Sequence, residues 1–325
     1  MSAKGKNNGH VWIVTFVAIV IAGVIYLLFP QHKSYSGIVA GFAAGHLILV
    51  LAAIFAGWVF TPVRILNKFI KRRKVNGYDF GWSPKWLYGF LLASLSTFLI
   101  AVYVYFSIDD NMLRFVVYTL LLLLALNFFI GNFTVRNSGR TTLITLPMVN
   151  LLANGGDKVL DAGCGAGRTS IAVAEAFQQA RLTAFDKFDA GYIDEGGMEL
   201  LKRNIKIAGI ENRIEMVSGD ITKTPFKDNQ FDAVVSSFMI DHLQNGKKQA
   251  LKESFRIMKP GGRFLMVIIV PGFSAFSIAN VLSLMLTSRK KWIRWIEQTG
   301  FKMLSNGNVN EGAYFFFEKP FDVKQ

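Results

Sequence analysis

An acid and a glycine-rich turn are the residues whose types and spacing could do chemistry. Residues 158–160 are expected to form a buried strand, which leads into Asp161 and then into the turn Gly163-x-Gly165-x-Gly167. Glycines let the backbone come close to a ligand, and the helix expected directly after the turn would offer free N–H groups at its start. This order of strand, acid, glycines and helix predicts a site for a nucleotide-like ligand.

The pattern does not predict a nicotinamide dinucleotide as that ligand. The dinucleotide fingerprint G-x-G-x-x-G requires glycine at position 168, where Arg168 stands. A second strand is expected over residues 181–186, and it ends in Asp186, twenty-five residues after Asp161. An acid at that place can accept hydrogen bonds from both hydroxyls of a ribose.

The stretch from Val159 to Ser170 resembles the first motif of class I S-adenosylmethionine-dependent methyltransferases, and the resemblance extends from about Leu151 to Lys319. It implies an α/β Rossmann-like domain whose cofactor is S-adenosyl-L-methionine. The alternation of expected strands and helices agrees with a parallel, doubly wound sheet. The resemblance implies that the cofactor is bound by Asp161, Gly163 and Gly165 at its amino acid end, by Asp186 at the ribose, by Asp220 and Ile221 at the adenine, and by Ser237 at the end of the fourth strand.

The loop Ser237–Leu243 is expected to lie between cofactor and methyl acceptor, because ligands of open sheets bind beyond the carboxyl ends of the strands. It is similar to the corresponding segment of small-molecule methyltransferases, including those that methylate quinones. Its candidate catalytic residues are Asp241 and His242. His242 could accept a proton near neutral pH, or it could be a packing residue, because methyl transfer to a strong nucleophile needs mainly proximity and alignment.

The first 135 residues are expected to form a bundle of four transmembrane helices. Each of four apolar stretches is long enough to cross a hydrocarbon core of ~30 Å. They cover about residues 11–29, 37–60, 86–108 and 112–130. A linker with a lead-in helix would follow over 136–150, and the methyltransferase-like domain would occupy 151–325.

The loop charges predict the orientation in the membrane. The loop over 61–85 is rich in Lys and Arg, whereas Asp109 and Asp110 make the loop between the last two spans acidic. The positive-inside rule then places the N-terminus and the catalytic domain in the cytoplasm, with the chain as a multi-pass protein of a bacterial cell membrane. Gly37, Gly41 and Gly45 share one face of the second span, which suits packing inside the bundle or a homodimer contact.

An apolar insertion over about 271–295 is expected to form a lid over the substrate pocket. Basic and Trp residues follow its apolar part, as in helices that lie in a membrane interface. The alternative is a lid that only packs on the domain.

Together these features predict a membrane-integrated methyltransferase that acts on a lipophilic small molecule taken from the bilayer. Two alternatives stay open, namely a soluble acceptor with the membrane part as an anchor, and a non-catalytic membrane sensor that binds the cofactor. A further interpretation, that the protein is an aminopropyltransferase, is supported only by Asp241. No metal site is expected, because the four histidines are scattered and Cys164 is the single cysteine. Nucleic acid is not an expected partner, because the basic excess lies beside the apolar spans: residues 1–140 hold 13 Lys/Arg against 3 Asp/Glu.

Overall fold

A computed structural model describes residues 76–81, 84–137, 144–190, 193 and 197–321, together with scattered positions between 20 and 45. The chain divides into two compact units, Met1–Pro62 and Val63–Gln325. The first two expected spans, 11–29 and 37–60, lie largely outside the described residues. Gly37, Gly41 and Gly45 are helical, and a Cβ atom built on any of them would meet nothing within 4 Å. Homodimerisation through this face stays a prediction.

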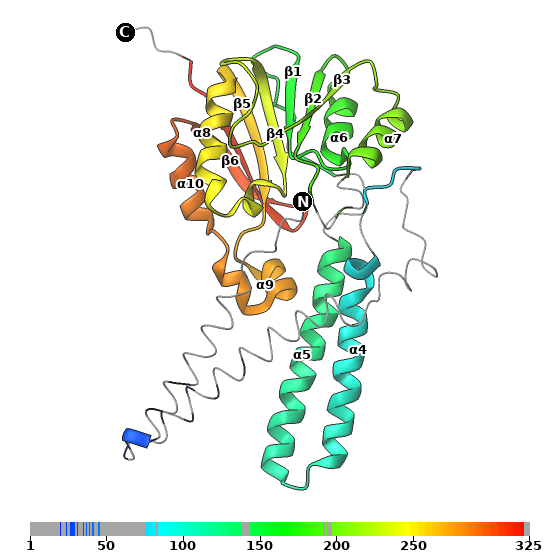
Figure 1. The fold of residues 1–325 in the computed structure, drawn as a ribbon, viewed down its shortest axis with the longest axis vertical. Helices are drawn as coiled ribbons and strands as arrows, with labels where there is room; N and C mark the ends of the chain where they lie inside the picture. The colour runs from blue at the N-terminus through cyan, green and yellow to red at the C-terminus, as the bar shows by residue number, and fades with distance from the viewer. Residues whose placement is uncertain are drawn as a thin grey trace. The chain divides into compact units, whose positions relative to one another are not determined.

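The second unit contains a seven-stranded sheet in the order β3-β2-β1-β4-β5-β7-β6 (Figure 1). The first five strands are parallel, and β7 pairs antiparallel with both β5 and β6. The strands are β1 (Lys158–Ala162), β2 (Arg181–Asp186), β3 (Ile214–Ser218), β4 (Phe231–Ser237), β5 (Met258–Ile268), β6 (Lys302–Val309) and β7 (Gly312–Glu318). The predicted Rossmann-like sheet is therefore confirmed, and the antiparallel strands β6 and β7 close it at one edge.

Helices cover both faces of the sheet because neighbouring residues of a strand point to opposite sides. Val159 and Leu160 of β1 illustrate this, since they belong to two different cores. One core contains residues of α6 (Arg168–Ala176) and α7 (Met198–Ala208), and the other contains residues of α8 (Lys247–Ile257) and α10 (Arg289–Gln298). The carboxyl ends of β1, β2 and β4 are left open at one edge, where the predicted site residues lie.

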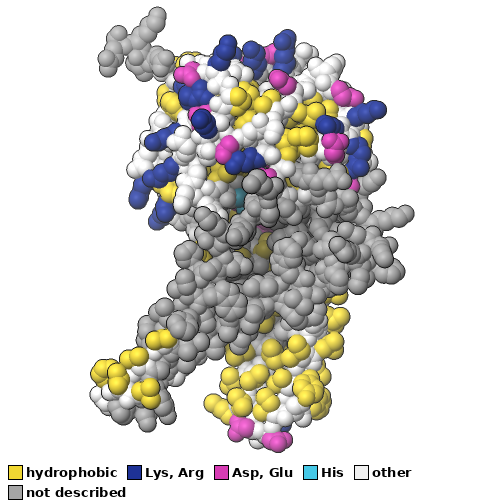
Figure 2. Space-filling model, in the orientation of Figure 1, with side chains coloured by type: hydrophobic (Ala, Val, Ile, Leu, Met, Phe, Trp, Pro, Cys, Tyr) yellow, Lys and Arg dark blue, Asp and Glu magenta, His cyan; other side chains and the backbone are white. Residues whose placement is uncertain are grey.

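Two described helices are long and apolar enough to cross a membrane, α4 (Pro84–Ser107) and α5 (Asn111–Asn137). They pair side by side as a hairpin, and most of their large apolar side chains are exposed (Figure 1). Hydrophobic side chains cover the lower part of this hairpin above an acidic tip, whereas Lys and Arg side chains are spread over the domain that contains the sheet (Figure 2). The two helices correspond to the third and fourth expected spans.

Both ends of this hairpin pack into the core beside the sheet. Before α4, Tyr78 and Phe80 are buried in the same core as α6 and α7. After α5, Ile144, Leu146 and Met148 are buried there as well. The loop before α4 and the chain after α5 therefore lie at the end of the hairpin that faces the sheet, and the acidic loop between the helices lies at the other end.

The structure differs from the sequence expectation around the linker. The last helix was expected to end at Ile130, but α5 continues to Asn137 because Asn132 and Thr134 are buried against neighbouring chain instead of facing water. No helix forms over residues 144–152, where a lead-in helix was expected, because Pro147 lies in the middle of this stretch and disfavours helical backbone at the residue before it.

The expected lid is in fact two different structures. α9 (Phe273–Ala279) and η6 (Asn280–Met285) form an apolar excursion after β5, and α9 contacts α5. The following basic segment is α10, whose Trp292 is fully buried in the core beside the sheet. The expectation that this Trp marks a membrane interface is therefore wrong, because its ring fills the space beside Ile296 under the sheet.

Candidate cofactor site

The glycine turn after β1 is held by its own backbone and by the end of β2. The N–H of Gly163 donates to the carbonyl of Phe185 at 2.7 Å. Gly163, Gly165 and Gly167 all have positive φ, so an L side chain would be strained at each. At Gly163 a Cβ atom would lie 2.3 Å from Cγ of Met239. Met239 belongs to the loop that follows β4, the strand next to β1. The turn thus brings the backbone of β1 against the loop after β4.

Asp161 lies under this turn and is completely buried. Its Oδ2 accepts a hydrogen bond of 2.6 Å from Ser170, whereas its Oδ1 has no partner among the described residues. Burial is the main reason that the pKa of Asp161 is raised to about 7, and the nearby Asp186 adds to it. A buried carboxylate oxygen without a partner is costly, so this atom is suited to receive a positively charged group of a ligand.

We expect cofactor affinity to fall below neutral pH because of Asp161. Only the ionised carboxylate attracts the ammonium group of the cofactor, and with a pKa of about 7 roughly nine-tenths of the carboxyl is protonated at pH 6. Calorimetry should therefore show about tenfold weaker binding at pH 6 than at pH 8. An Asp161→Asn variant should bind weakly at both pH values without this slope. The raised pKa also means that this carboxyl stabilises the free protein most in acid and loses that contribution as pH rises through about 7.

Asp186 ends β2 and points toward the glycine turn. Its Oδ2 accepts a hydrogen bond from the N–H of Gly165 at 2.9 Å, and its Oδ1 accepts one from the N–H of Phe188 at 2.8 Å. Burial raises the pKa of Asp186 above its usual value, and these two backbone donors oppose the rise. Each carboxylate oxygen keeps a lone pair for a further donor, such as a ribose hydroxyl.

Asp220 follows β3 and is already paired. Lys187 Nζ lies 2.7 Å from its Oδ2, and both the N–H and the hydroxyl of Thr222 donate to its Oδ1. Burial alone would raise the pKa of Asp220, but the bonds from Lys187 and Thr222 lower it to about 2. The neighbouring Ile221 is buried, and its side chain packs in the core that contains Phe185. Adenine binding by Asp220 and Ile221 stays a prediction, and it requires the carboxylate to accept a ligand amino group while bonded to Lys187.

The loop after β4 brings the remaining predicted residues together. The hydroxyl of Ser237 is hydrogen-bonded to that of Thr169 at the start of α6. Oδ2 of Asp241 accepts a hydrogen bond of 3.0 Å from the N–H of Ile269, and its buried Oδ1 has no partner among the described residues. His242 is exposed. Asp241 thus ties this loop to the chain that leads into α9, and the proton-accepting roles of Asp241 and His242 stay predictions.

Asn204 connects the site to the loop before α4. Its side chain bonds both the N–H and the carbonyl of Asp79, and it also donates at 2.8 Å to the carbonyl of Ala166 in the glycine turn. Arg203 adds an ion pair of 3.1 Å with the Asp79 carboxylate. The loop before α4 is therefore hydrogen-bonded through one buried side chain to the turn of the candidate cofactor site.

We expect Asn204→Leu to destabilise the catalytic domain by about 2–4 kcal/mol, because it leaves three buried backbone groups unpaired. The glycine turn should also loosen, so the dissociation constant for S-adenosylmethionine should rise in the same variant. Thermal unfolding and calorimetry check both effects. A Lys202→Met variant, which removes only an exposed ion pair with Glu199 on the same helix, should leave both quantities nearly unchanged, and equal effects of the two variants would contradict this role of Asn204.

Sequence reasoning missed Lys187, Met239, Asn204 and Asp79 as neighbours of the site. Each lies on a segment whose distance from the glycine turn is decided by the fold. One signal was available, since Asn76-Gly77-Tyr78-Asp79-Phe80-Gly81 has the composition of an ordered turn within an otherwise basic loop.

The described residues fit a sulfonium cofactor with an amino acid end and a nucleoside end. The unpartnered Oδ1 of Asp161 suits an ammonium group, and the glycines of the turn adopt positive φ without strain and carry no Cβ atoms that would obstruct a ligand. No group of three or more metal-ligating side chains occurs in the part of the chain that the structure describes.

Residues 159–262 match the family described as methyltransferase domain. A demethylmenaquinone methyltransferase of Clavibacter sepedonicus is 36% identical over 34% of this chain and 40% of its own length. A fatty-acid O-methyltransferase of Mycolicibacterium smegmatis is 29% identical over 52% of both chains. A demethylmenaquinone methyltransferase of Staphylococcus epidermidis is 29% identical over 51% of this chain and 68% of its own.

The chain spans between 40% and 52% of the length of the first curated relatives that it matches. Among solved structures, a geranyl diphosphate methyltransferase in complex with SAM is 13% identical over 53% of this chain and 82% of its own, with a TM-score of 0.43. The family match covers the glycine turn, Asp186, Asp220 and the loop after β4. The chain therefore contains a class I methyltransferase domain, and the cofactor of this domain is S-adenosylmethionine.

Proposed function

We propose that this protein is a membrane-integrated S-adenosylmethionine-dependent methyltransferase, which acts at the cytoplasmic face on a lipid-soluble small molecule. The observation that carries the proposal is the docking of both ends of the α4–α5 hairpin into the catalytic core. A hairpin that enters and leaves the bilayer on one side holds the domain at that surface. Seven Lys and Arg residues in the loop over 61–85 make that side the cytoplasmic one under the positive-inside rule.

The position of the excursion after β5 supports an acceptor from the membrane. Phe273, Leu284 and Met285 are each more than 70% exposed, although they are large and apolar. An exposed apolar patch of this kind marks an interaction surface. α9 also contacts α5, so the patch lies beside a helix that can cross the bilayer. Names of two relatives, which refer to demethylmenaquinone and to fatty acids, agree with a lipophilic acceptor.

The bound cofactor supplies an electrophilic methyl group on a sulfonium sulfur. Asp161, Gly163 and Gly165 would hold its amino acid end, Asp186 its ribose, and Asp220, Ile221 and Ser237 the remaining contacts. The loop Ser237–Leu243 would align the nucleophilic atom of the acceptor with the methyl carbon, so that a bond to carbon forms as the carbon–sulfur bond breaks. The unpartnered Oδ1 of Asp241 is suited to take the proton that the acceptor gives up, and the exposed His242 is the second candidate for this role.

The test is methyl transfer by the full chain from methyl-labelled S-adenosylmethionine to bacterial membrane extracts. We expect label in the organic-solvent fraction and none with Asp186→Ala. Label confined to water-soluble products would favour a soluble acceptor. Cofactor binding without any transfer would favour a non-catalytic sensor that binds the cofactor. Either result would contradict the proposal.

A further inference from the structure

α9 is attached closely to α5 by small and polar residues. A Cβ atom at Gly131 of α5 would lie 2.4 Å from the backbone oxygen of Ser277, so only glycine allows this approach. Next to it, the hydroxyls of Thr134 and Ser277 share a hydrogen bond of 2.8 Å that is buried. The excursion after β5 is therefore fixed against the helix, and some space remains between them.

That space is an apolar groove with a volume of about 430 Å³, within the range of ligand pockets. Its lining residues are Phe129, Ile130, Phe133 and Thr134 of α5, Phe273 of α9, and Glu311 of the turn between β6 and β7. We call it the α5–α9 groove. Phe129 and Phe133 are exposed along α5, so the groove is continuous with the surface that this helix offers to lipid.

The groove ends next to the loop Ser237–Leu243. Glu311 precedes Gly312, and a Cβ atom at Gly312 would lie 2.9 Å from the ring of Phe238. Phe238 directly follows Ser237, and its φ of +55° places it in a conformation that bulky residues rarely adopt. A molecule whose chain lies along α5 would thus have its polar end at Glu311, with Phe238 between that end and the cofactor site.

Glu311 restricts the polar end of such a molecule. Among the residues that the structure describes along the groove, it is the single charged one, and its Oε2 accepts a hydrogen bond from the hydroxyl of Ser274. A carboxylate at the rim repels an anionic head group and can accept a hydrogen bond from a hydroxyl. This distinction is not contained in the proposed function, which names only a lipophilic acceptor.

We propose that the α5–α9 groove binds the hydrocarbon chain of the methyl acceptor, and that this acceptor is an uncharged, hydroxyl-bearing lipid. The inference rests on the proposed function, because only that function makes the lipid in the groove the methyl acceptor. Continuity with a helix able to cross the membrane favours a lipid chain as occupant, and the charge of Glu311 favours a neutral head group.

The test is a native mass spectrometry titration of the detergent-purified full chain with oleyl alcohol and, separately, with oleate. We expect a 1:1 adduct with oleyl alcohol that forms about fivefold more tightly than the adduct with oleate, as one partly screened charge contact would give. Glu311→Gln, which can still accept the bond from Ser274, should remove this difference. Ile130→Trp should fill the groove and weaken both adducts at least about tenfold, whereas Leu120→Trp, at an exposed position of α5 outside the groove, should leave both unchanged.

The titration separates failure of this inference from failure of the proposed function. Absence of a 1:1 oleyl alcohol adduct, as when other parts of this chain fill the groove, would overturn the inference. Equal binding by Ile130→Trp and Leu120→Trp would overturn it as well. Equal affinity for the alcohol and the acid would overturn the inference that the head group is uncharged. Binding of S-adenosylmethionine is measured on the same samples, and its absence beside an intact oleyl alcohol adduct would contradict the proposed function alone.

Discussion

Asp186→Ala should weaken binding of S-adenosylmethionine by at least about 100-fold. Two hydrogen bonds from ribose hydroxyls to a carboxylate contribute about 1.5–3 kcal/mol each. The substitution also leaves the N–H groups of Gly165 and Phe188 without their acceptor, so the glycine turn loses a fixed point. Isothermal titration calorimetry of the detergent-purified chain measures the effect directly.

Asp189→Ala is the matched control, because Asp189 is an exposed acid three residues further along the same loop. It should bind the cofactor within about twofold of the unchanged protein, since exposed charges contribute little. If Asp186→Ala bound as tightly as Asp189→Ala, with an unchanged circular dichroism spectrum, the assignment of the ribose site would be wrong.

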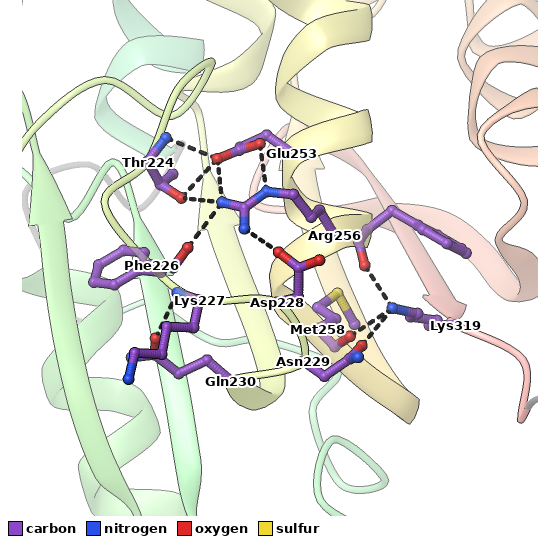
Figure 3. Close-up of polar contacts among 11 residues, drawn as sticks. Thr224, Phe226, Lys227, Asp228, Asn229, Gln230, Glu253, Arg256, Met258 and Lys319 are labelled. Carbon is purple, nitrogen blue, oxygen red and sulfur yellow. Dashed lines mark hydrogen bonds and ion pairs between the residues drawn. The ribbon is translucent and has the colours of Figure 1, made fainter.

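Arg256→Leu should strongly destabilise the catalytic domain, although Arg256 lies outside the apolar core. Arg256 donates to both oxygens of Glu253, at 2.7 and 3.0 Å, and it also bonds Asp228 and the carbonyl of Phe226 (Figure 3). Glu253 is 8% exposed, and the hydrogen bonds from Arg256 are the first reason that its pKa is lowered to about 2. Without Arg256 a buried carboxylate keeps only Thr224 as a donor, which costs about 3 kcal/mol.

We expect thermal unfolding of the catalytic domain about 5–10 °C lower in Arg256→Leu. Because the pKa of Glu253 is lowered, its contribution to stability is present above about pH 4.5 and is lost as the pH falls toward 2, so the difference between the two proteins should shrink in acid. Lys202→Met removes an exposed ion pair with Glu199 and should change the unfolding temperature by less than about 2 °C. A similar shift in both variants would contradict the role given to Arg256.

Local pattern was enough to predict the elements that position the cofactor site. The strands before Asp161 and Asp186 were expected at nearly their observed ends, because a short apolar run bounded by an acid or by glycines has few other conformations. The Rossmann-like order followed from the alternation of strands and helices. The resemblance to methyltransferases then assigned residues that lie at the carboxyl ends of the parallel strands or directly after them, and their roles in binding stay predictions.

Features that depend on distant segments were not predictable in this way. The pairing of Lys187 with Asp220 joins the ends of β2 and β3, and nothing in either segment reveals the distance. Trp292 has the sequence neighbourhood of a membrane-interface residue, but packing under the sheet buries it. Thr134 was expected to follow the end of a span, yet its hydroxyl is hydrogen-bonded to Ser277 of α9 and the helix continues to Asn137. In each case tertiary contact outweighed the local pattern.

The measurement that tests the account most directly compares delivery of the acceptor within and between vesicles. The full chain is reconstituted with bacterial membrane lipids in the same vesicles, or is mixed with separate vesicles that contain those lipids, and label from S-adenosylmethionine is followed into the organic fraction. The account predicts rapid labelling when enzyme and lipids share a bilayer and little labelling when they do not. Equal labelling in both arrangements would contradict an acceptor taken laterally from the membrane.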